Sequence, residues 1–246
     1  MPRVIKHPDV RRSEILDWAQ RVFLSRGYDN ASLNDVIAEA GLSKGAFYHY
    51  YSSKEQLLEA LAGRFAQSAY EAVRSVLQDA SLDPLERLRA FVDRSWNQKI
   101  ETAPVQWRLF EAFYRPENLV LYQRVTLAWA ALFRPALSQL IADGVARGVF
   151  DTFDAESVAD LFMNLPMSTY PILAEIIASP AKDRTDELID RLDRRLRLYG
   201  IAIDRVLGLP DGSVPLANIQ HLRALIDARD CANNSSQNRE SGLRQT

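Results

Sequence analysis

The residue types best suited to chemistry lie close together near the N-terminus of this 246-residue chain. Two lysines flank a run of five consecutive aromatic side chains, and two small residues precede that run. Cationic, imidazole and hydroxyl groups donate hydrogen bonds to phosphate oxygens, and small residues allow close approach to base edges. The residues concerned are Lys44, Gly45, Ala46, Phe47, Tyr48, His49, Tyr50, Tyr51 and Lys54. This composition indicates a surface that contacts nucleic acid.

Capping signals place these residues on the second of two short helices. Ser32 is a good N-cap, and Asp35 supplies the reciprocal carboxylate of a capping box. Gly41 falls just past the last apolar residue of this first helix, where a left-handed backbone lets the chain turn. Ser43 then caps a second helix that is predicted to run to about Tyr51. Two helices joined by such a turn form a helix-turn-helix, whose second helix enters a major groove of DNA.

The segment from Gly41 to Tyr51, followed by Ser53-Lys54-Glu55, closely resembles the DNA-binding signature of the TetR family of bacterial transcriptional regulators. The resemblance covers about residues 9–58. Tyr51 replaces the phenylalanine that normally packs inward in this family, so Phe47 and Tyr51 are expected in the core. The resemblance and the residue chemistry together predict a DNA interface made of Ser32, Asn34, Ser43, Lys44, Gly45, Ala46, Tyr48, His49, Tyr50 and Lys54.

The rest of the chain shows helical periodicity and no convincing strand, so the predicted fold is all-α. A first helix from about Asp9 to Gly27 completes a three-helix head, with Tyr28 as a hydrophobic plug. A long helix, opened by a capping pair of Ser52 and Glu55 and ending near Asp79, joins the head to a larger helical domain for ligand binding and dimerisation. The predicted divisions are a flexible arm (1–8), the DNA-binding head (9–54), the larger domain (55–228) and a disordered tail (229–246).

Prolines and capping residues divide the larger domain into further predicted helices. Asp83-Pro84 opens one that reaches about Thr102, Pro104 begins the next, and Pro116-Glu117 starts a longer one that ends near Gly144 and Gly148. Pro135 is expected to kink this longer helix because it removes a backbone hydrogen bond. The remaining predicted helices are residues 154–179, interrupted by Pro166 and Pro171, then residues 186–207 and residues 216–228.

Aromatic and thioether side chains recur through these middle helices, with a few polar groups among them. Apolar walls with a few polar groups are typical of small-molecule cavities, although a packed helical core explains the same residues. A pocket of this kind favours an apolar or aromatic effector. The candidate ligand-binding residues are Trp96, Trp107, Phe110, Glu111, Tyr114, Tyr122, Trp129, Met163, Met167 and Tyr170.

An apolar stripe bordered by arginines follows the last long helix. It suits a two-fold interface, and internal core packing explains it nearly as well. Members of the resembling family pair through their two C-terminal helices, which favours a homodimer on a palindromic operator. The candidate interface residues are Leu188, Leu192, Leu196, Tyr199 and Ile203.

Composition excludes several other classes. The single cysteine, Cys231, allows neither an internal disulfide nor a cysteine-built zinc site, which fits a reducing cytoplasm. No membrane helix is expected, because Arg124 and Arg134 interrupt the most apolar region. Residues 1–54 hold 8 Lys and Arg against 6 Asp and Glu, so the head is slightly basic although the chain carries −2 overall.

These observations predict a cytoplasmic DNA-binding regulator, a dimeric repressor that a small ligand releases from its operator. A DNA-binding architectural or adaptor protein without an effector is the alternative. The letters G-x-S-x-G occur at Gly41 to Gly45, but there they form the turn between two predicted helices and not the strand-to-helix elbow of a nucleophile. No G-x-x-x-x-G-K-[ST] or H-E-x-x-H pattern is present. An enzyme is therefore not expected, and neither a cofactor nor a bound metal is predicted.

Overall fold

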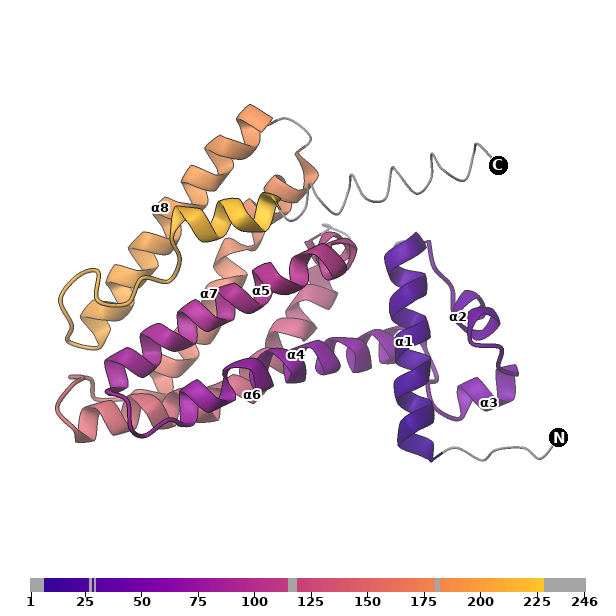
Figure 1. The fold of residues 1–246 in the computed structure, drawn as a ribbon, viewed down its shortest axis with the longest axis horizontal. Helices are drawn as coiled ribbons and strands as arrows, with labels where there is room; N and C mark the ends of the chain where they lie inside the picture. Colours follow the sequence, from indigo (N-terminus) through magenta and orange to yellow (C-terminus); the bar gives the residue numbers. More distant parts are fainter. Residues whose placement is uncertain (1–6, 27, 29, 115–118, 180–181, 228–246) are drawn as a thin grey trace.

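The computed structural model describes residues 7–26, 28, 30–114, 119–179 and 182–227. Helices are the only regular secondary structure within these ranges, as predicted. The predicted tail 229–246 and most of the predicted arm 1–8 lie outside the described residues. Figure 1 shows the three head helices at one end of the molecule and a long helix leading from them into the larger helical domain.

The head consists of α1 (Pro8–Arg26), α2 (Leu33–Glu39) and α3 (Lys44–Tyr48). The predicted capping box is present, because the Ser32 hydroxyl accepts from the Asp35 backbone N–H and the Asp35 side chain accepts from the Ser32 backbone N–H at 2.8 Å. Gly41 has the predicted left-handed conformation, with φ +61°. These local signals are enough to fix α2 and the turn that follows it.

The third helix ends earlier than predicted, at Tyr48 instead of Tyr51. The backbone N–H of Tyr50 donates to the carbonyl of Phe47 at 2.8 Å, three residues back, so the chain tightens there into a turn. Tyr51 is nevertheless buried, at 4% exposure, and packs with Phe47 in the core of the head. The tight turn therefore keeps the predicted inward position of Tyr51 while shortening the helix.

The connecting helix, α4 (Lys54–Gln78), has its N-cap one residue later than predicted, at Ser53 instead of Ser52. Ser53 is the N-cap and its hydroxyl accepts from the Gln56 N–H, while the Gln56 side chain accepts from the Ser52 N–H at 2.7 Å. The predicted pairing of Ser52 with Glu55 is therefore wrong by one residue. Gln56 takes the role expected of Glu55, because the cap moves from Ser52 to Ser53 and its third following residue is then Gln56.

The apolar face of α4 is shared between two cores. Its first turns place Leu57, Leu58 and Leu61 in the core of the head. Its later turns place Val73 and Leu77 in the core of the larger domain. One helix therefore belongs to both units, as the sequence predicted for a connecting element.

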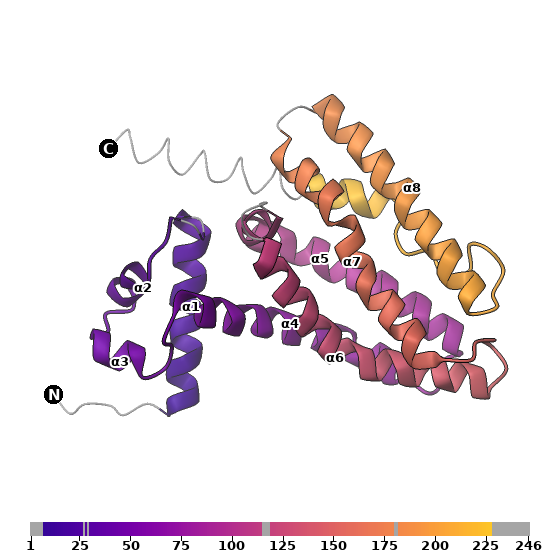
Figure 2. The same cartoon turned by 180° about the vertical axis from the view of Figure 1, so that it is seen from behind.

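The larger domain contains α5 (Pro84–Tyr114), α6 (Leu119–Ala146), α7 (Ala155–Ala178) and α8 (Lys182–Val206), and residues 219–227 form a further helical segment. Figure 2 shows α7 lying between α6 and α8, which agrees with the close contacts of α7 with both. Asp154 caps α7 and Ser179 ends it, as predicted.

Two predicted boundaries in this domain are wrong. The chain does not break at Pro104, because α5 is continuous from Pro84 to Tyr114. Burial of Ala103 and Trp107 on either side of the proline offsets the hydrogen bond that proline cannot make. In addition, α8 begins at Lys182, ahead of the predicted Asp186. The helices α6 and α7 also continue through their prolines, and the predicted kink at Pro135 stays a prediction.

Two helical stretches have the length and hydropathy of membrane spans: Tyr122–Ala146, with mean hydropathy 1.3, and Ala155–Ala178, with mean hydropathy 1.2. The expectation that Arg124 and Arg134 exclude such a stretch is therefore wrong on composition. Core helices of soluble proteins pass the same test, and both stretches supply buried side chains to the core of the larger domain. Of the most apolar window in each stretch, 28% and 29% is buried inside the chain.

The predicted dimer stripe on α8 lies inside the chain. Leu188, Leu192 and Leu196 pack in one buried cluster, Ile203 belongs to the larger core, and Tyr199 packs against that core. The internal-packing alternative therefore accounts for the stripe, and a partner cannot reach the buried side chains. Away from this buried stripe, Leu198 is 62% exposed.

Candidate nucleic-acid interface and effector cavity

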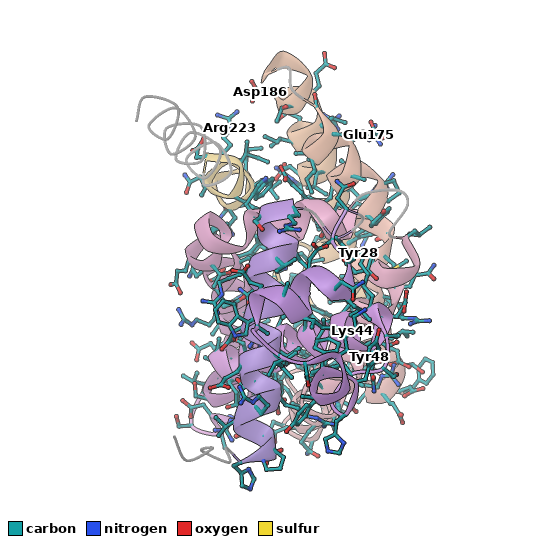
Figure 3. The ribbon with its side chains drawn as sticks, turned by 90° about the vertical axis from the view of Figure 1, so that its right-hand side faces the viewer. Tyr28, Lys44, Tyr48, Glu175, Asp186 and Arg223 are labelled. Atoms are coloured by element: carbon teal, nitrogen blue, oxygen red, sulfur yellow. The ribbon has the colours of Figure 1, made fainter. Side chains whose placement is uncertain are left out.

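The start of α3 is open to an approaching ligand. The Ser43 hydroxyl caps the helix by accepting from the Ala46 N–H at 3.3 Å. Lys44 and Tyr48 lie beside each other on the face of the head turned away from the larger domain (Figure 3). A methyl group added at Gly45 would meet no protein atom within 4 Å, so the backbone here is accessible. Among the described residues, no carboxylate pairs with Lys44.

The aromatic run divides between the core and the surface. Phe47 is fully buried, whereas Tyr48 keeps 49% of its surface exposed and His49 is also exposed. Tyr50 differs from the prediction, because it is half-buried against the head core, with its ring 5.3 Å from that of His49. Tyr48 and His49 are therefore the two rings most available to phosphate groups.

The other predicted DNA-binding residues surround this surface in different roles. Lys54 places its Nζ 4.0 Å from the ring centroid of Tyr28, a cation–π contact that ties the start of α4 to the turn after α1. Asn34 is exposed on α2. The Ser32 hydroxyl is engaged in the cap, and hydrogen bonds from Ser32 hold the pKa of Asp35 below its usual value, with a smaller contribution from Arg26.

A partly open cavity of about 170 Å³ lies in the larger domain and is lined by residues of α4 to α8 and by Leu216. Four of the predicted ligand-binding residues line it: Trp96, Tyr114, Trp129 and Met163. The rest of its wall is mostly apolar, and the polar groups are those of Ser95, Gln98, Lys99 and Thr169. An apolar cavity with a few polar groups is the arrangement that small-molecule sites use.

The remaining predicted ligand residues lie elsewhere. Trp107 is buried away from the cavity, and its indole N–H donates to the Glu111 carboxylate at 3.0 Å. Met167 packs against the core of the head. The side chain of Phe110 lies outside the described part of the structure. Trp107 and Glu111 thus form a local pair on α5, for which spacing of four residues is a sufficient explanation.

Tyr114, Tyr122 and Tyr170 form a cluster between the cavity and the head. Tyr114 lines the cavity, and its ring centroid lies 5.2 Å from that of Tyr122 and 5.6 Å from that of Tyr170. Tyr122 and Tyr170, 4.5 Å apart, belong to the core cluster of the head. Burial raises the pKa of Tyr114 well above its usual value and that of Tyr122 to about 12, so both hydroxyls stay uncharged at neutral pH.

Lys99 is the polar cavity residue that the sequence reasoning missed. Its Nζ lies 4.8 Å from the ring of Trp96 and 5.9 Å from the ring of Trp129. Burial lowers the pKa of Lys99 to about 8. The available signal was its position three residues after Trp96, on the same face of one helix.

A capped helix-turn-helix joined by one continuous helix to an all-helical domain with an internal cavity defines a helix-turn-helix transcriptional regulator. A family model described as "Bacterial regulatory proteins, tetR family" matches residues 15–61. The head of this chain therefore carries the DNA-binding domain of the TetR family of bacterial transcriptional regulators.

Three relatives illustrate the range of similarity. The uncharacterised HTH-type transcriptional regulator YerO of Bacillus subtilis is 26% identical over 191 residues, which cover 75% of this chain and 66% of YerO. The transcriptional repressor KstR2 of Mycobacterium tuberculosis is 33% identical over 89 residues, which cover 36% of this chain and 44% of KstR2. The crystal structure of RolR with the ligand resorcinol is 19% identical, with a TM-score of 0.52 over 91% of this chain and 93% of that chain.

Proposed function

We propose that this regulator acts as a cytoplasmic dimeric repressor, which a small, largely apolar or aromatic ligand releases from a palindromic operator. KstR2 is named a repressor, and RolR was crystallised with resorcinol, a small aromatic ligand. The observation that carries the proposal is the position of Tyr114, which lines the cavity and contacts two members of the head core.

The DNA-binding step follows from the exposed start of α3. Two heads related by a two-fold axis would place their α3 helices in successive major grooves, roughly 34 Å apart. Lys44, Tyr48 and His49 would contact phosphates and base edges, and the open backbone at Gly45 would permit close approach. The residues predicted at the interface but engaged in packing or capping, Ser32 and Tyr50, would support this surface.

Release follows if the ligand favours a different placement of the tyrosine cluster. A ligand in the cavity touches Tyr114 directly, and Tyr122 and Tyr170 pack into the same cluster as the first turns of α4. Arg124 of α6 also pairs with Glu59 of α4 at 2.7 Å. Displacing α6 would therefore move α4 and change the distance between the two heads, provided that the ligand binds the displaced state more tightly.

The dimer would use the exposed face of α8 that carries Leu198, because the buried stripe of this helix packs inside the chain. A Leu198→Glu variant would place a charge in that interface and is expected to shift the purified protein from dimer to monomer in light scattering. Retention of the dimer by this variant would exclude the α8 face as its centre.

The test of the proposed function starts with selection of bound DNA from a random pool, followed by titration of candidate ligands against the selected operator. A ligand-responsive repressor loses operator affinity when ligand binds and blocks transcription from a promoter that contains the operator. An architectural protein would bind DNA equally with and without ligand. Equal head separation in ligand-bound and free crystals would contradict the release mechanism.

A further inference from the structure

We infer that the cavity takes a small organic acid, whose carboxylate pairs with Lys99 and whose apolar body lies against Trp96 and Trp129. The inference deepens the proposed ligand response and depends on it. It follows from two hydrogen-bond donors that the cavity leaves without acceptors, and from the size of the space beside them.

The first donor is the Lys99 ammonium group. No acceptor or carboxylate among the described residues bonds to its Nζ, and its recorded contacts are with the faces of Trp96 and Trp129. Burying a charge without a partner is costly, and a ring face compensates only part of that cost. Lys99 is half-buried. The two charged side chains that are buried in the described part of this domain both have partners: Arg87 contacts Asp143 at 2.7 Å, and Asp204 accepts from three backbone N–H groups.

The second donor is the indole N–H of Trp129. This atom is buried and has no hydrogen-bond partner among the residues that the structure describes, although buried tryptophan N–H groups usually find one. In contrast, the indole N–H of Trp96 donates to the carbonyl of Leu216 at 2.6 Å. Lys99 and Trp129 line the same cavity. A ligand that offers two acceptor oxygens and one negative charge satisfies both groups, and a carboxylate has these properties.

The volume sets the size of the rest of the ligand. An apolar cavity of about 150 Å³ holds benzene, so the 170 Å³ found here accommodates about one aromatic ring with a short substituent. A ring or short alkyl chain would pack against the indoles and the aliphatic wall. A phosphate ester would bring about two negative charges to a single cation, and an amine would be repelled by Lys99, so a monocarboxylic acid is the best match.

The experiment compares acids with their neutral amides of nearly equal shape. Benzoate, phenylacetate, 3-phenylpropionate and hexanoate, each beside its amide, are titrated into the full chain by calorimetry at pH 7. At least one acid should bind about tenfold or more tightly than its amide, because only the acid forms a charge-assisted pair. Failure of all four acids to bind, or equal affinity of acids and amides, would overturn the inference.

Two variants assign the effect to the two donors. Lys99→Met keeps the length of the side chain and removes its charge, so the preference for the acid should disappear while amide binding is retained. Trp129→Phe keeps a ring and removes the N–H, and acid affinity should fall several-fold. An unchanged acid preference in Lys99→Met would contradict the assignment, provided that circular dichroism shows the native helical content.

The pH dependence gives an independent measurement. The carboxylic acids are fully ionised above about pH 6, and Lys99 is protonated below its pKa of about 8. Acid affinity should therefore be constant between about pH 6 and 7 and fall as the pH rises through 8, while amide affinity stays flat. A flat profile for the acid in the wild-type protein would contradict the pairing.

Operator binding separates this inference from the proposed function. Lys99 belongs to α5 and not to the head helices, so Lys99→Met should bind the selected operator with wild-type affinity in the absence of ligand. If the protein binds an operator but no acid, the inference fails and DNA binding stands. If no DNA is selected from the random pool, the proposed function itself fails.

Discussion

The head and the larger domain present their cations in opposite ways. Lys44 stands exposed at the start of α3, beside an open backbone and exposed aromatic rings. Lys99 is half-buried in a cavity, with its Nζ 4.8 Å from the ring of Trp96, and burial lowers its pKa to about 8. An exposed cation stays solvated until a polyanion arrives, whereas a half-buried cation is only partly compensated until a ligand enters. The first arrangement suits DNA, and the second suits a small molecule.

The two sites also differ in how the chain assembles them. The surface around Lys44 comes from one continuous segment, with Ser43 as its cap and Gly41 as its turn. The cavity takes side chains from five helices and from Leu216, separated by up to 147 residues between Ala69 and Leu216. Connection between the sites depends on α4 and on the tyrosine cluster. Single substitutions can therefore test the DNA-binding surface, the cavity and the connection between them separately.

The largest expected effect is on the free energy of unfolding, and it comes from a substitution in the larger domain. Asp204 is fully buried and accepts from the backbone N–H groups of Gly212, Ser213 and Val214 at 2.7 to 3.0 Å. Asp204→Ala leaves three buried donors unpaired, so the free energy of unfolding should fall by about 3–5 kcal/mol. Ser53→Ala, which removes an accessible helix cap in the head, should cost about 1 kcal/mol.

Urea unfolding followed by circular dichroism measures both variants. If Ser53→Ala lowered the free energy of unfolding more than Asp204→Ala, the prediction would be wrong, because the larger polar contribution to stability would then lie in the head. Ligand binding should be weakened in Asp204→Ala only to the extent that the domain is unfolded.

The second effect concerns DNA affinity. Lys44→Ala removes one cationic contact from each head, about 1.4 kcal/mol or tenfold per head, so a dimer should lose on the order of 100-fold. Sequence preference should change as well, because Lys44 lies at the start of the helix that meets base edges. Lys54→Ala should weaken binding across all sequences and reduce the salt slope by about 1. Equal losses on operator and random DNA for both variants, measured by fluorescence anisotropy, would contradict this division.

The sequence predicted the head better than the cavity for a physical reason. Ser32, Asp35 and Gly41 act on residues a few positions away, so their effects can be derived without knowing the fold. The cap of α4 shows the limit of this approach, because the prediction missed the cap by one residue: Gln56, and not Glu55, accepts from the Ser52 N–H. The burial of Phe47 and Tyr51 also follows from spacing on a single short segment.

The cavity depends on contacts that spacing cannot specify. The recurrence of aromatic residues made Trp96 and Trp129 candidates for a cavity wall, but it could not show which side chains meet across a space. It likewise could not separate Trp107, which pairs with Glu111 on its own helix, from the residues of the wall. Lys99 was missed because a lysine on a helix is normally solvated, and only tertiary packing partly buries it.

The third effect tests the connection between the two sites. Tyr114→Leu keeps an apolar cavity wall and removes the ring contacts with Tyr122 and Tyr170. Ligand affinity should change by only a few-fold, whereas the ligand-induced loss of operator affinity, about 1–3 kcal/mol in typical coupled systems, should largely disappear. Met163→Leu alters the same wall without touching the tyrosine cluster and should retain coupling. If the ligand still lowered the operator affinity of Tyr114→Leu to the wild-type extent, the tyrosine cluster would not be the connection between the cavity and the head.

The smallest effect distinguishes the open backbone of α3 from an ordinary helical glycine. Gly45 and Gly63 both lie within helices, and a methyl group at either position would meet no protein atom within 4 Å. Alanine favours helix over glycine by about 0.8–1 kcal/mol, so both Gly→Ala variants should be slightly stabilised in urea. Only Gly45→Ala should weaken operator binding, by several-fold, because its methyl group occupies space needed by a base edge. Equal operator affinity for the two variants would show that DNA does not approach this turn of α3, and the comparison between an exposed and a partly enclosed site would then depend on Lys44 alone.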